Sequence, residues 1–113
     1  MLTEEKLKKL SKEKILIFDG ALGTYLGKFG LKPGDFGGHE GLNEYLSVSR
    51  PDVIKQAHLD YLEAGADVVE TNTFGCNRFV LAEYGLENKV GELNLAAVKL
   101  AREAAETSSS PEK

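Results

Sequence analysis

Residues 67–74, DVVETNTF, begin with apolar side chains and end in a polar cluster, and they decide how the rest of the sequence is interpreted. The apolar part predicts a short buried strand over residues 66–70. A hydrophobic core does not favour the polar part, which comprises Glu70, Thr71, Asn72 and Thr73. A strand that ends in such a cluster is typical of a parallel α/β fold, in which ligands bind beyond the carboxyl ends of the strands.

A second candidate strand lies upstream, at residues 14–18, KILIF, and it stops at Asp19 and Gly20. Its unbroken apolar run is typical of a strand that is covered on both faces. Adjacent strands lie about 4.8 Å apart, so Asp19 and residues 71–73 are expected to meet around one small polar molecule. The backbone N–H groups beyond this strand suit a carboxylate.

Simpler explanations exist for the same side chains. Asp19 is a common turn former in front of glycine, and Asn72 suits the cap of a following helix. A lone cysteine near a strand end, such as Cys76, is more often a packed residue than a nucleophile. Neither His39 nor His58 falls at a zinc-ligand spacing from it. We therefore assign no catalytic residue and no metal ligand from the sequence.

Helical patterns and a glycine-rich loop fill the rest of the chain. Helices are predicted over residues 3–12, 49–64, 77–84 and 88–106, with Ser49 capping the second of them. The order of elements predicts two consecutive β/α units, and both a (β/α)8 barrel and a Rossmann-like sheet require more strands than these. The expected organisation is an N-terminal helix at 1–13, a partial α/β domain at 14–106 and a polar tail at 107–113.

The composition of the 113 residues excludes several classes of protein. A net charge of -4 opposes general binding to nucleic acid or to an anionic membrane. The N-terminus has no apolar core of the kind that a secretory signal needs, and the single Cys76 suits a reducing compartment. We therefore expect a cytoplasmic protein with one compact core at most.

Three segments resemble the homocysteine S-methyltransferase domain family, and most closely its cobalamin-dependent methionine synthase branch. They are ILIFDGALGT at 15–24, LNEYLSVSRPDVIKQAHLDYLEAGADVVETNTFGCNRFVLAEYGL at 42–86 and NLAAVKLAREAAE at 94–106. The turn DGAxGT, the helix start RPD, the link EAGAD and the strand end ETNTF are specific in this order. The resemblance covers residues 14–106 and only the N-terminal part of the family's domain.

The resemblance implies a (β/α)8 TIM barrel, of which this chain would hold about two β/α units, and a substrate, homocysteine, at the strand ends. It implies that Asp19 receives the ammonium group and that the backbone of Gly20 and Ala21 receives the carboxylate. The wall of the pocket would comprise Glu70, Thr71, Asn72 and Thr73. In this family a zinc ion holds the substrate sulfur as a thiolate, which keeps it ready to attack a methyl group.

The family's zinc-binding cysteines lie late in its domain, and Cys76 does not match any of them. The resemblance therefore predicts a segment that is inactive alone and is either truncated or completed by a separate polypeptide. Methylcobalamin, held by another domain, is the favoured methyl donor, while methylmethionine and betaine stay open. The alternative is a non-catalytic small α/β module for binding or assembly that self-associates through its open strand edges.

Overall fold

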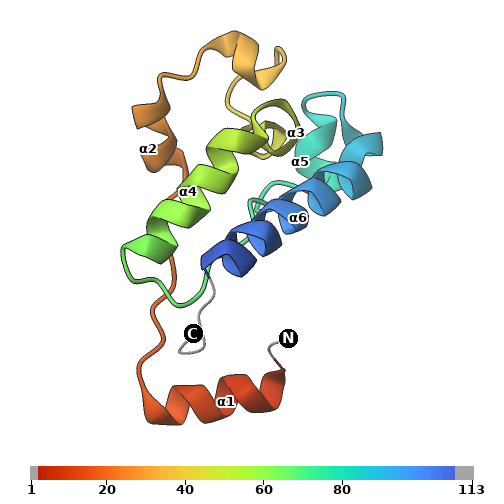
Figure 1. Cartoon of the computed structure of the whole chain (residues 1–113). Coiled ribbons are helices and arrows are strands. Elements are labelled where there is room, and N and C mark those ends of the chain that lie inside the picture. Colours follow the sequence, from red (N-terminus) through yellow and green to blue (C-terminus); the bar gives the residue numbers. More distant parts are fainter. Residues whose placement is uncertain (1–2, 109–113) are drawn as a thin grey trace.

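Two helices form the centre of the structure, α4 (Pro51–Glu63) and α6 (Val90–Ser108), which pack against each other (Figure 1). The structure is a computed structural model that describes residues 3–108. Apolar residues recur every three to four positions in both helices, so each helix has one face to bury. The buried side chains are Val53, Ile54, Ala57, His58 and Leu62 on α4, and Leu93, Ala97, Leu100, Ala101 and Ala104 on α6. Both helix predictions are confirmed, apart from their ends.

The predicted helix ends differ from the observed ones. Ser49 does not cap α4, because it is the last residue of a separate turn, α3 (Leu46–Ser49), and its hydroxyl donates to the carbonyl of Tyr45 at 3.3 Å. Arg50 takes the cap position without a side-chain hydrogen bond, and Pro51 fills the first helical position. At the other end α6 continues to Ser108, and residues 109–113 of the predicted tail lie outside the described residues.

Short helices and turns surround this pair. Besides α3, they are α2 (Gly23–Leu26), α5 (Arg78–Ala82), and the 3-10 turns η1 (Gly27–Phe29), η2 (Pro33–Phe36), η3 (Asn43–Tyr45) and η4 (Glu87–Lys89). Two apolar clusters form the core: the first holds Leu26, Leu46, Val53, Ile54 and Leu100, and the second holds Leu42, Cys76, Leu81 and Leu93. The glycine-rich segment therefore supplies core residues as well as loop.

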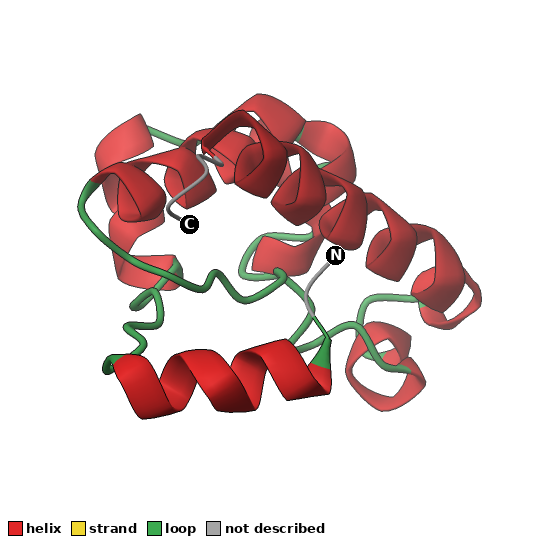
Figure 2. Ribbon diagram, turned by 60° about the horizontal axis from the view of Figure 1, so that its bottom comes forward, coloured by secondary structure: helices red, strands yellow, loops and turns green. Residues whose placement is uncertain are grey.

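Helix α1 (Glu4–Glu13) lies apart from the other helices (Figures 1 and 2). Thr3 caps it by accepting the backbone N–H of Lys6 at 3.2 Å. It buries no side chain. The radius of gyration is 15.2 Å, whereas a compact chain of this length has about 13 Å, so this separation makes the molecule elongated. No helix of the described residues is long and apolar enough to cross a membrane.

The predicted α/β fold with two β/α units is wrong. Residues 3–108 form helices and turns without a strand or sheet, so the described chain is all-helical (Figure 2). The two predicted strands are extended segments joined by one isolated parallel bridge, between Phe18 and Val68. A strand with a continuous apolar run needs cover on both faces, but Ile15 and Ile17 stay 87% and 57% exposed. Without that cover the periodic helices, which bury their apolar faces against each other, determine the fold.

The two extended segments nevertheless lie next to each other. The backbone N–H of Asp19 donates to the carbonyl of Val68 at 2.9 Å, and that of Asp67 donates to the carbonyl of Ile17 at 2.7 Å. The Asp67 carboxylate also binds Lys14 at 2.8 Å and accepts the N–H of Ile17 at 3.1 Å. These contacts place the residues after position 18 beside those after position 69.

Candidate functional site

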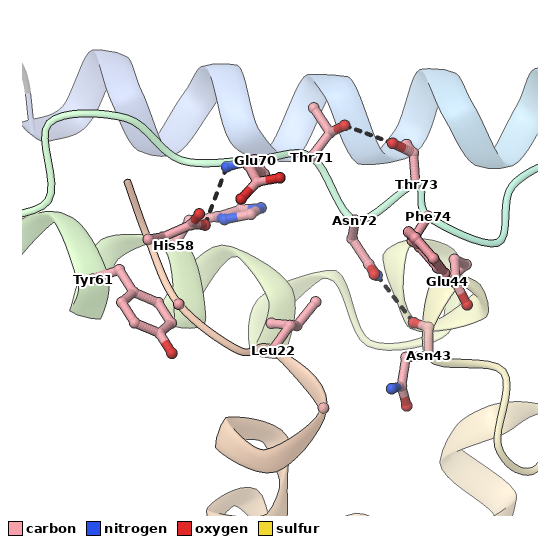
Figure 3. A pocket seen from close by; sticks show the side chains of 13 residues that line it. Leu22, Asn43, Glu44, His58, Tyr61, Glu70, Thr71, Asn72, Thr73 and Phe74 are labelled. Atoms are coloured by element: carbon pink, nitrogen blue, oxygen red, sulfur yellow. Dashed lines mark hydrogen bonds between the residues drawn. The ribbon is translucent and has the colours of Figure 1, made fainter. Parts of the chain in front are cut away.

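A pocket of about 290 Å³ lies between α4, the residues after position 18 and the segment 70–74 (Figure 3). It is lined by six of the seven residues that the sequence proposes for a site, namely Asp19, Gly20, Glu70, Thr71, Asn72 and Thr73. Ala21 does not line it; its carbonyl accepts a hydrogen bond of 2.6 Å from the hydroxyl of Tyr61. The structure therefore brings the two groups of polar residues together, while their role in binding a ligand stays a prediction.

The carboxylate of Asp19 has two different oxygens. Oδ2 accepts the backbone N–H of Glu70 at 3.1 Å, which fixes the orientation of the side chain. Oδ1 is buried and has no hydrogen-bond partner within the described chain. A buried acceptor without a partner is unfavourable, so this oxygen is suited to a donor that comes from outside the chain.

Asn72 anchors one wall of the pocket. Its side chain is 6% exposed, and its amide donates to the carbonyl of Asn43 at 3.0 Å and to the hydroxyl of Ser47 at 3.3 Å. The predicted capping role falls to another residue, because Asn77 caps α5 by accepting the N–H of Val80. Asn72 is thus a structural support that ties segment 70–74 to η3 and α3.

Two hydroxyl groups lie on the same wall. The side chains of Thr71 and Thr73 form one hydrogen bond of 2.7 Å. Because each hydroxyl carries one hydrogen, the bond between them uses one O–H and leaves the other to donate elsewhere.

The pocket is negatively charged. Asp19, Glu44 and Glu70 line it, and none of its described lining residues is a lysine or an arginine. Glu44 is held in place by the backbone N–H of Gly75, which donates to its carboxylate at 2.8 Å. This electrostatic environment favours a ligand with a cationic group.

His58 is the buried titratable group of this pocket. It projects from α4 with 2% of its surface exposed, and its Nε2 has no hydrogen-bond partner among residues 3–108. Burial lowers the pKa of His58, and the negative charge of Asp19 opposes that shift only in part. The imidazole is therefore neutral at pH 7.

Sequence reasoning missed several residues that line the pocket. These are Leu22, Gly23, Asn43, Glu44, His58, Tyr61 and Phe74. His58 and Tyr61 are three positions apart on one helix, a spacing that places them on one side, and this was a usable signal. Asn43 and Glu44 belong to a short turn without periodicity, and no pattern in the sequence marks them.

The described residues do not fit a zinc site. Within residues 3–108 no three His, Cys, Asp or Glu side chains are grouped so that they could hold a metal ion. Cys76 is buried, and burial together with Glu44 raises its pKa to about 11, so it is a protonated thiol at neutral pH. The side chains that line the pocket offer oxygen and nitrogen groups to a ligand.

Comparison with known proteins identifies the family of the chain. Residues 16–112 match the family described as Homocysteine S-methyltransferase. The chain is 43% identical over 101 residues to methionine synthase of Mycobacterium tuberculosis, which covers 89% of this chain and 8% of that protein. It is also 43% identical over 100 residues to methionine synthase of Mycobacterium leprae, covering 88% of this chain and 8% of that protein. The chain belongs to the homocysteine S-methyltransferase family.

Proposed function

We propose that this chain provides the homocysteine-binding segment of a homocysteine S-methyltransferase of the methionine synthase type. Family membership supports the reaction class, and the negatively charged pocket at Asp19 supports the place where the amino acid binds. The chain spans about 8% of the length of its curated relatives. The activity of a whole methionine synthase is therefore part of the proposal.

One observation carries the binding site: Asp19 Oδ1 is buried and unpartnered, and Asp19 lines a pocket that lacks a cationic side chain among its described lining residues. An ammonium group carries a positive charge and three N–H donors, so it satisfies this oxygen. A hydrogen bond to a charged group contributes about 1.5–3 kcal/mol, which corresponds to roughly tenfold to hundredfold in affinity.

The other end of the amino acid has its own partners in this proposal. Gly20 lines the pocket, and the backbone N–H groups of Gly20 and Ala21 would receive the ligand carboxylate, as the sequence predicts. The remaining O–H of the Thr71 and Thr73 pair is a further donor. Glu70 contributes its backbone N–H to the positioning of Asp19.

Zinc and the methyl donor belong to other parts of such an enzyme in this proposal. The described residues provide no set of zinc ligands, so we derive no methyl-transfer step from them. Methylcobalamin, bound by another domain, is the proposed donor. Assays of the 113-residue chain with homocysteine, zinc and methylcobalamin should yield no methionine, and sustained methionine formation would contradict this division of roles.

An NMR titration with L-homocysteine tests the binding site. Under reducing conditions, homocysteine should shift the amide signals of Glu70 and Thr71 in the labelled chain. Asp19→Asn should weaken binding at least tenfold, because the amide oxygen must accept the N–H of Glu70 and the NH2 group then faces the ammonium.

The matched control is Glu87→Gln, which removes an exposed carboxylate in η4, outside the pocket. It should bind homocysteine as the unmodified chain does. Unchanged pocket amides at saturating homocysteine, or equal affinity of the Asp19 variant, would refute the proposed site.

Exposed apolar side chains favour a second candidate, self-association. Ile15 is 87% exposed, and Ile17 and Phe18 on the same segment are more than half exposed. Such surface is unfavourable in water and favours contact with a second copy. Light scattering should then show a concentration-dependent rise in mass that Ile15→Glu reduces, while a monomer at all concentrations would exclude this candidate.

A further inference from the structure

His58 occupies a position that packing alone does not explain. It lies on α4 between core residues Ala57 and Leu62, and it is as buried as they are. A leucine would fill such a site without a polar atom to satisfy, whereas the imidazole leaves Nε2 without a partner. The unpartnered nitrogen belongs to a side chain that lines the pocket (Figure 3).

Asp19 Oδ1 is the second buried atom without a partner, and it lines the same pocket. Asp19 and His58 both line this pocket, so a ligand in it lies beside both residues. No hydrogen bond joins the two atoms. We assign the single N–H of the neutral imidazole to Nδ1, which makes Nε2 an acceptor like Oδ1.

The other ionisable groups around His58 do not supply a donor to either atom. Glu70 and Glu44 are carboxylates without a hydrogen to donate, and the hydroxyl of Tyr61 already donates to the carbonyl of Ala21. A ligand with at least two N–H or O–H groups would satisfy both atoms.

We propose that His58 Nε2 and Asp19 Oδ1 together bind one primary ammonium group, with His58 as an acceptor that selects for the N–H donors of the ligand. This inference rests on the proposed function and adds a residue and a selectivity to it. A primary ammonium has three N–H groups and satisfies both atoms. A quaternary ammonium has the same charge but no N–H group, so the pair should reject it.

Two probes separate this inference from the proposed function. Methylammonium chloride carries only the ammonium, and tetramethylammonium chloride is its control without N–H donors. With ¹⁵N-labelled histidine in the 113-residue chain, the Nε2 signal should lie in the range of an unprotonated nitrogen. It should shift with L-homocysteine and with methylammonium, but not with tetramethylammonium.

Substitutions give a second readout. His58→Gln keeps an acceptor near the position of Nε2 and should bind homocysteine within about threefold of the unmodified chain, while His58→Leu keeps the volume without an acceptor and should lose roughly tenfold. Circular dichroism establishes that each variant is folded. If His58→Leu does not fold, the Nε2 signal of the unmodified chain still decides.

The outcomes are distinct. A shift of Nε2 with methylammonium but no binding of homocysteine would refute the proposed function and support the ammonium site. Homocysteine binding with an unmoved Nε2, a protonated Nε2, or an equal response to tetramethylammonium would overturn the role of His58 while the proposed function stands.

Discussion

The hydroxyl of Tyr61 donates a hydrogen bond of 2.6 Å to the carbonyl of Ala21, across the backbone of Gly20. A Cβ atom at position 20 would lie 3.1 Å from that hydroxyl oxygen and 3.3 Å from a ring carbon of Tyr61. The absence of a side chain at position 20 therefore lets α4 approach the loop that carries Asp19.

Replacing Gly20 by alanine should weaken this contact. The ring of Tyr61 cannot retreat without lengthening its bond to Ala21, so Gly20→Ala should cost about 1 kcal/mol in the free energy of unfolding, measured with urea. In a Tyr61→Phe background the cost should be smaller by about 0.5 kcal/mol or more. Gly27→Ala is the matched control, because nothing lies within 4 Å of a Cβ there; equal effects of the two alanines would contradict the prediction.

Asn72 should be needed for stability whatever the pocket binds. Asn72→Asp replaces two donor contacts of a buried side chain by a carboxylate that cannot donate, and it adds a charge to a pocket that Glu44 and Glu70 also line. We expect a loss of about 2–3 kcal/mol in the free energy of unfolding. Asn88→Asp, at an exposed position of η4, should change it by less than about 0.5 kcal/mol. A loss for Asn72→Asp as small as that of the control would refute the anchoring role.

His58 should make the stability depend on pH. Because its pKa is lower in the folded chain than in the unfolded one, the unfolded chain binds more protons as the pH falls below about 6.5. The folded state should lose stability through that window, and the loss should level off below the folded pKa. Thermal unfolding measured from about pH 7.5 to about pH 5, which spans the ordinary pKa of histidine, should show this decline in the unmodified chain. His58→Gln should reduce it, and parallel curves would be evidence against a buried neutral imidazole.

Cys76 should be a slow thiol. Burial and Glu44 raise its pKa to about 11, so at neutral pH only a very small fraction is thiolate. Alkylation by iodoacetamide should be at least tenfold slower than for free cysteine, and it should become fast after unfolding in urea. Rapid alkylation of the folded chain would contradict the buried environment.

The helices were predictable from the sequence because each carries its own signal. The apolar spacing in α4 and α6 and the Thr3 cap of α1 are local patterns, and the structure has these helices within a few residues of the predicted bounds. The cap at Ser49 was wrong because an additional turn, α3, ends there and leaves Arg50 at the helix start.

The strands were not predictable in the same way, since a strand depends on partners that its own residues do not specify. The apolar run at 14–18 has the composition of a buried strand, yet Ile15 is exposed. Phe18, the last residue of the run, forms one isolated bridge to Val68. The polar ends of both segments still meet in one pocket, because Asp19 bonds to the backbone at Val68 and Glu70. His58 was outside the predicted site because its neighbours on α4 are apolar, and only the orphaned Nε2 distinguishes it from a core residue.

In the proposed site the carboxylate of Asp19 has two tasks, since Oδ2 accepts the backbone N–H of Glu70 and Oδ1 accepts from the ligand. Ligand binding and the order of segment 70–74 would then be thermodynamically coupled, and each would strengthen the other. A substitution at position 19 that changed the ligand affinity would also weaken the hydrogen bond that orders segment 70–74. Adjustment of affinity would have to fall on neighbouring positions instead.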